Sequence, residues 1–224
     1  MSTSTSRAPN PASAVGRAGR GRLAWLGFAL WVGAAGCGAA GPVTWNPGPS
    51  STGPVAQDEL DYADQRRLWT RHAENYFDLE ARILVDATLF SPGFARALAQ
   101  AEGELQGLTT AERAPRLAAA MAGAQRETAF LVAMVTNQFF WNDLDHPEGI
   151  FRAHLLTAEG KVLEPLGVER LEERQVVALR PLFPYIQMSS VVYRLRFPAL
   201  AEPRPVTLRI AGTPGAVELT WELQ

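Results

Sequence analysis

Phe77-Asp-Leu-Glu-Ala-Arg-Ile-Leu-Val-Asp-Ala-Thr-Leu89 is the stretch that decides the fold, because its apolar residues fall at every second position. The residues between them are charged or polar, with Leu84 as the exception. Strict alternation over this length is typical of a strand with one buried face. The Glu, Ala, Leu and Arg content favours a helix instead, but we give the period more weight and expect a strand.

Two helices are expected directly after this strand. Ser91 followed by Pro92 provides an N-cap residue and a proline at the first helical position. Apolar residues then recur at helical spacing until Gly107, and a second helix runs to Ala124. The pair is therefore expected to form a helical hairpin inserted at about 91–125 between two strands.

Strand patterns dominate the rest of the chain, and Asp58 to about Asn75 has a helical pattern with acids in its first turn. The further expected strands are Thr128–Thr136, Ile150–Thr157, Lys161–Arg170, Gln175–Arg180, Ser190–Pro198, Pro205–Ala211 and Val217–Leu223. About eight strands with frequent turns predict a mainly β fold with α, an immunoglobulin-like antiparallel β-sandwich. We expect an N-terminal helix at 58–76 and the sandwich, with its helical insertion, at 77–224.

Composition limits the partners and the chemistry. Residues 1–36 hold four arginines and no acid, so the rest of the chain has 17 basic and 23 acidic residues, a formal net charge of −6. A mildly acidic protein has no electrostatic basis for binding nucleic acid. Cys37 is the only cysteine, which excludes an intramolecular disulfide and a cysteine-based zinc site. We expect no metal and no cofactor.

The N-terminus has the layout of an export signal. Residues 1–22 are polar and carry only positive charge, and Leu23–Ala35 is a run of 13 residues without a charge. That run is shorter than the roughly 20 residues that span a bilayer, and it has the length of a signal-peptide core. It ends in Ala34-Ala35-Gly36-Cys37, which resembles the lipobox of bacterial lipoproteins, although that family prefers leucine where Ala34 stands.

The lipoprotein resemblance implies an address. Residues 1–36 would be a signal peptide removed before Cys37, and acyl chains such as palmitate on Cys37 would hold the protein to a membrane. Gly38, in place of an aspartate, favours the outer membrane, with the domain facing the periplasm. An ordinary signal peptide with an unmodified cysteine is the alternative. Residues 37–57 are rich in Gly, Pro and Ser and are expected to form a flexible tether.

Motifs for catalysis are absent from the sequence. It contains no Gly-x-Ser-x-Gly, no phosphate-binding glycine loop and no His-Glu-x-x-His, so we assign no catalytic residue. The most unusual stretch is 139–149, where three aromatic residues run into a loop with three acids, an amide and an imidazole.

Three interpretations of this stretch remain open. Its oxygen ligands could hold calcium, although their spacing differs from that of an EF-hand. Its aromatic residues could form a platform for a sugar or peptide. It could also be a plain connection with turn hydrogen bonds. Arg152 and His154 share one face of a strand, which makes them further ligand candidates. The candidate ligand-binding residues are Phe140, Trp141, Asn142, Asp143, Asp145, His146, Arg152 and His154.

These patterns together favour a membrane-anchored envelope lipoprotein that is a non-catalytic binding or assembly-accessory module. Its expected partners are the membrane, through lipid on Cys37, and envelope proteins or cell-wall components. The alternative is an envelope hydrolase with an unusual site around Asp143, Asp145 and His146.

Overall fold

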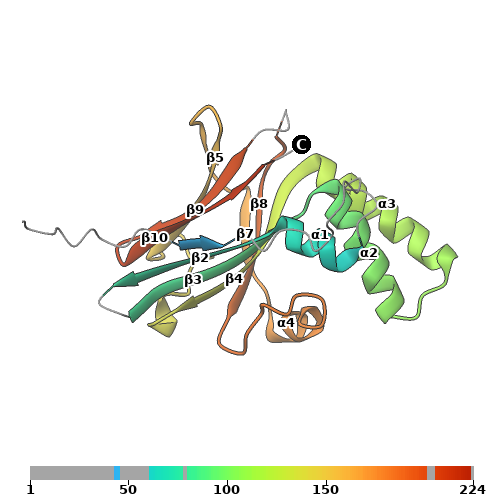
Figure 1. The fold of residues 1–224 in the computed structure, drawn as a ribbon, viewed down its shortest axis with the longest axis horizontal. Helices are drawn as coiled ribbons and strands as arrows, with labels where there is room; N and C mark the ends of the chain where they lie inside the picture. The colour runs from blue at the N-terminus through green and yellow to red at the C-terminus, as the bar shows by residue number, and fades with distance from the viewer. Residues whose placement is uncertain (1–42, 46–60, 78–79, 201–204, 223–224) are drawn as a thin grey trace, which may run out of the picture. The chain divides into compact units, whose positions relative to one another are not determined.

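The computed structural model describes residues 43–45, 61–77, 80–200 and 205–222. These residues form a mixed α/β fold of two antiparallel sheets, four α-helices and one short 3₁₀ helix (Figure 1). The predicted signal peptide 1–36, Cys37 and most of the predicted tether lie outside the described residues.

The larger sheet has six strands in the order β1-β2-β3-β4-β8-β7. Their bounds are Val43–Trp45 (β1), Thr70–Phe77 (β2), Glu80–Leu89 (β3), Glu127–Thr136 (β4), Gly167–Arg170 (β7) and Val191–Pro198 (β8). The smaller sheet has four strands in the order β10-β9-β5-β6. Their bounds are Phe151–Thr157 (β5), Val162–Leu163 (β6), Val206–Gly212 (β9) and Gly215–Trp221 (β10).

The alternation that predicts a strand over Phe77–Leu89 is confirmed by β3, in which Ile83, Val85 and Ala87 are fully buried. One face of each sheet supplies the shared core. Trp221 of β10 is fully buried, its ring centroid lies 5.1 Å from that of Phe130 of β4, and its indole Nε1–H donates to the Trp69 carbonyl oxygen at 2.7 Å. The apolar faces of both sheets therefore meet in one core, where burial stabilises by about 25 cal/mol per Å² of apolar surface.

The expected helical insertion is confirmed. Helices α2 (Pro92–Leu105) and α3 (Thr110–Arg126) lie between β3 and β4, which pair directly with each other. Ser91 caps α2 through its side chain, and Thr109 with Glu112 forms a capping box at the start of α3. Figure 1 shows the hairpin leaving the larger sheet at the end opposite to the one where β2 ends and β3 begins.

The predicted N-terminal helix at 58–76 is corrected by the structure. Helix α1 (Tyr62–Trp69) begins after its N-cap Asp61 and ends before β2 (Thr70–Phe77). Pairing of β2 with β3 on one side and β1 on the other draws the second half of the predicted helix into the sheet. This tertiary pairing outweighs the local helical pattern, whose propensity signal is weak.

Two predicted strands are also corrected. The single strand expected over Lys161–Arg170 is split by Pro165, which has no N–H to donate, so that β6 joins the smaller sheet and β7 joins the larger one. The strand expected over Gln175–Arg180 is helix α4 (Glu173–Leu179). The acid in its first turn and Pro181 just beyond its end are helix signals that outweigh the two adjacent valines.

The tether prediction for 37–57 needs one correction, because Val43–Trp45 forms β1 and pairs antiparallel with β2. A β-branched pair followed by an aromatic residue has high strand propensity, and β1 provides partners for backbone groups of β2 that would otherwise lie at a sheet edge.

Candidate functional site

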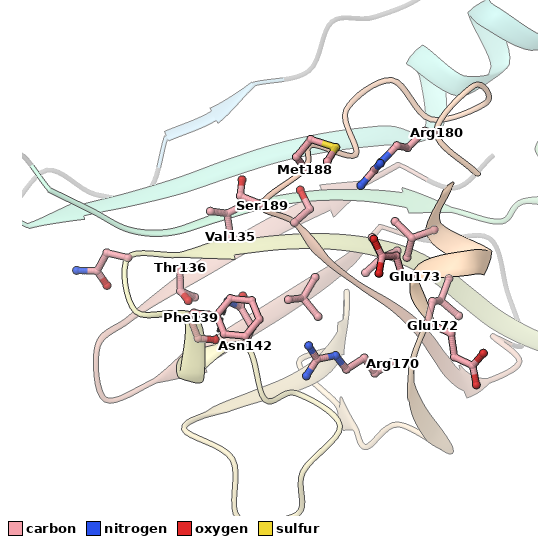
Figure 2. Close-up of a pocket in the computed structure, with 16 residues that line it drawn as sticks. Val135, Thr136, Phe139, Asn142, Arg170, Glu172, Glu173, Arg180, Met188 and Ser189 are labelled. Atoms are coloured by element: carbon pink, nitrogen blue, oxygen red, sulfur yellow. Dashed lines mark hydrogen bonds between the residues drawn. The ribbon is translucent and has the colours of Figure 1, made fainter. Parts of the chain in front are cut away.

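The candidate site is a hollow of about 670 Å³ on the larger sheet, beside the turn that follows β4. Its lining includes Val135 of β4, Val192 of β8, Phe139 of the 3₁₀ helix η2 (Phe139–Trp141), and Val176 of α4. The turn before β8 closes another side with Met188. The hollow therefore exists because α4 and two turns stand around the end of the sheet (Figure 2).

Exposed apolar side chains border this hollow. Met188 is 83% exposed, and Phe139 and its neighbour Phe140 are 70% and 68% exposed. Single exposed apolar residues are common, but large ones grouped around a hollow are typical of interaction sites. The aromatic side chains of residues 139 and 140 thus remain exposed, although a loop that only connects two strands could have buried them.

Charged residues line the hollow as well. Figure 2 shows Arg170, Glu172, Glu173 and Arg180 around α4, with Phe139 on the opposite side. Within the described ranges, neither arginine side chain forms an ion pair, and the Nε atom of Arg180 is buried without a hydrogen-bond partner. An unmade hydrogen bond at a buried donor costs about 1–3 kcal/mol, so Arg180 has donor capacity that a bound group could use.

The loop after the aromatic residues is held by its own turn hydrogen bonds. The Asp143 Oδ2 atom accepts the Ile150 N–H at 2.8 Å, and the Asp143 carbonyl oxygen accepts the His146 N–H at 2.9 Å. Asn142 is buried, lines the hollow and donates from Nδ2 to the Phe139 carbonyl oxygen at 3.1 Å. This arrangement is the turn-forming role that Asp and Asn commonly have.

The remaining predicted ligand residues are divided between two places. Asp145 and His146 are exposed, and the His146 Nδ1 atom accepts the Glu148 N–H at 3.2 Å. Arg152 donates from Nη1 to the His146 carbonyl oxygen at 3.1 Å. His154 lies further along β5, with its Nε2 atom 3.2 Å from the Glu164 Oε1 atom.

The structure therefore brings some candidates to the hollow and leaves others away from it. Of the predicted residues, only Asn142 lines the hollow itself, and Phe140 and Trp141 adjoin it through the η2 turn. The sequence prediction missed Arg170, Arg180 and Met188, which come from β7, from the end of α4 and from the turn before β8. A helical assignment of 173–179 would have placed Arg180 at a helix end, but nothing local marks Met188.

Two smaller hollows lie elsewhere in the described residues. One of about 370 Å³ separates the helical hairpin from the larger sheet and includes Glu102, whose pKa is raised by burial. Another of about 220 Å³ adjoins His72, whose pKa is raised mainly by its hydrogen bond to Asp86. The arginines there have partners within the protein: Arg67 pairs with Asp64 at 2.8 Å, and Arg71 donates from Nη1 to the Leu68 carbonyl oxygen at 2.7 Å.

The described residues provide neither a metal-binding cluster nor a membrane-spanning helix. No group of three or more His, Cys, Asp and Glu side chains is placed there to share a metal ion. No helix there has the length and apolar character needed to cross a bilayer.

Comparison of the chain with protein-family models, with curated proteins and with solved structures finds no match.

Proposed function

We propose that this chain is a bacterial envelope lipoprotein, cleaved before Cys37 and anchored by lipid on that residue, whose domain is a non-catalytic binding module. We further propose that its two sheets form an immunoglobulin-like β-sandwich. The anchor is supported by the signal layout of residues 1–37. The outer membrane is the proposed location, with the domain in the periplasm.

One observation carries the binding role: exposed apolar side chains and unpaired arginines border the same hollow. A polypeptide segment has groups that complement this lining. Its apolar side chains could pack on Phe139 and Met188, and its carbonyl or carboxylate oxygens could accept hydrogen bonds from Arg170 and Arg180. The proposed ligand is accordingly a segment of another envelope protein.

The hydrolase alternative has less support. The Asp143 carboxylate accepts a backbone N–H inside its own turn, and Asp145 and His146 are exposed. A general base works best where its surroundings shift its pKa and hold it against the substrate. The hydrogen bonds of this loop favour a structural role for these residues.

The anchor is tested by replacing Cys37 with alanine. The wild-type protein is expected to incorporate labelled palmitate and to sediment with membranes, whereas Cys37→Ala does neither. Label on the variant would refute anchoring through Cys37.

The binding role is tested with a photoreactive residue at position 188, and with a control at Lys161, an exposed residue on the β5–β6 turn. We expect an adduct with an envelope protein from position 188 only, and its loss when Arg170 and Arg180 are both changed to alanine. Equal adducts from both positions, or an adduct with cell-wall glycan, would contradict the proposed ligand.

A further inference from the structure

Three exposed large aromatic side chains lie at one end of the larger sheet. Tyr76 is the penultimate residue of β2 and is 45% exposed, and Phe139 and Phe140 follow β4 and are about 70% exposed. Strands β2 and β4 both run toward this end, because each pairs antiparallel with β3. We call it the aromatic end, defined by Tyr76, Phe139 and Phe140.

The chain enters the sheet beside this end. Strand β1 begins at Val43, which pairs with Glu74, and it runs antiparallel to β2, away from the aromatic end (Figure 1). Glu74 pairs with Leu84, and Leu84 pairs with Val135 of β4. Because neighbouring strands lie about 4.8 Å apart and three such spacings separate β1 from β4, Val43 and Val135 lie roughly 14 Å apart across the sheet. Phe139 follows four residues after Val135.

The covalent chain limits how far Cys37 can lie from this place. Only residues 38–42 separate Cys37 from Val43. Six residue steps, fully extended, span at most about 22 Å. A lipid on Cys37 thus lies within reach of a bilayer that also contacts the aromatic end. The helical hairpin, in contrast, leaves the sheet at the opposite end of β3 and β4.

We infer that the aromatic end contacts the lipid surface, with Tyr76 and Phe140 at the membrane interface, Phe139 left to line the neighbouring hollow, and the helical hairpin directed away from the bilayer. Aromatic side chains favour the interfacial region of bilayers. The acyl chains of Cys37 keep the domain at the membrane, so even a few apolar side chains act at a high local concentration of lipid. This inference rests on the proposed function, because it needs the lipid on Cys37.

The experiment uses the lipidated protein in vesicles of phosphatidylcholine, whose neutral surface limits the readout to apolar insertion. Acylation blocks the thiol of Cys37, so a new cysteine is the only labelling site for an environment-sensitive dye. The test variant is Phe140→Cys, and the matched control is Ala111→Cys, an exposed position in the first turn of α3. Mass spectrometry of the N-terminal peptide reports lipidation separately.

We expect a blue shift of the dye at position 140 and its quenching by nitroxide-labelled lipids, with neither effect at position 111. A second reporter at Tyr76→Cys should be quenched too, and should lose quenching when Phe140 is changed to serine.

Two results would overturn the inference and leave the anchor intact: a lipidated protein without quenching at positions 140 and 76, or one quenched at position 111 instead. Shielding of position 140 from aqueous iodide by envelope proteins, but not by pure vesicles, would assign the end to a protein partner and also overturn it. An N-terminal peptide without lipid would overturn the anchor and, with it, this inference.

Discussion

Replacing Trp221 with phenylalanine tests how β10 is joined to the end of α1. The Trp221 indole Nε1–H donates to the Trp69 carbonyl oxygen at 2.7 Å, between residues that are 0% and 7% exposed. Phenylalanine keeps a ring against Phe130 but leaves that buried carbonyl without this donor, at a cost of about 1–3 kcal/mol. The cavity left by the missing ring atoms adds about 1 kcal/mol.

The free energy of unfolding should therefore fall by about 2–4 kcal/mol. With a urea slope of about 2 kcal/mol per molar, the unfolding midpoint should move down by roughly 1–2 M. Far-UV circular dichroism is the appropriate signal, because it does not depend on the tryptophan being replaced.

Trp141→Phe is the matched control. Trp141 is half-buried, and its indole N–H makes no hydrogen bond with the described part of the chain. The same chemical change should lower the free energy of unfolding by less than about 1 kcal/mol there. If both variants showed the same midpoint, the bond from Trp221 to Trp69 would not be a main connection between β10 and the end of α1.

Two further predictions concern pH and glycine. The pKa of His72 is raised from its ordinary value of 6.5, mainly by the hydrogen bond to Asp86. Protonated His72 therefore stabilises the fold fully below pH 6.5, and this stabilisation is lost as the pH rises through the higher pKa of the folded state. Thermal midpoints should fall over that range in the wild type, and His72→Gln should remove this step; an unchanged step would exclude His72 as its source. A Cβ at Gly149 would collide with the Asp143 carbonyl oxygen, so Gly149→Ala should destabilise by about 1–3 kcal/mol in urea titrations. Gly123→Ala on α3 has open space and should stabilise by about 0.5–1 kcal/mol, and the opposite order of these two variants would contradict the backbone geometry.

Local patterns predicted the elements whose signals are strong along the chain. Alternation identified β3, and the N-cap at Ser91 with the following proline identified α2. Both signals depend on neighbouring residues alone, namely a buried face with period two and a side chain that accepts an orphan N–H.

Pairing between distant strands determines the elements that local sequence patterns did not predict. The first strand, Val43–Trp45, lies in a Gly- and Pro-rich segment and is a strand because β2 is beside it. The division of 161–170 between two sheets depends on which strand each half meets.

The candidate site was predicted only in part. The aromatic residues at 139–141 stand out in composition, which is why the sequence locates that side of the hollow. Arg170, Arg180 and Met188 come from three different segments, and only the packing of α4 over the end of the sheet brings them together. Their proximity is a property of the fold, with no trace in their spacing along the chain.

The helical hairpin has a consequence for the order in which the chain folds. Strands β3 and β4 cannot pair until residues 90–126 close on themselves, and a disordered segment of that length costs about 3 kcal/mol of loop-closure entropy. If the two antiparallel helices form early, the start of α2 and the end of α3 lie close together. The loop-closure cost is then lower before β3 and β4 meet. Weakening the capping box at Thr109 should consequently slow refolding more than it speeds unfolding, which stopped-flow measurements in urea can separate.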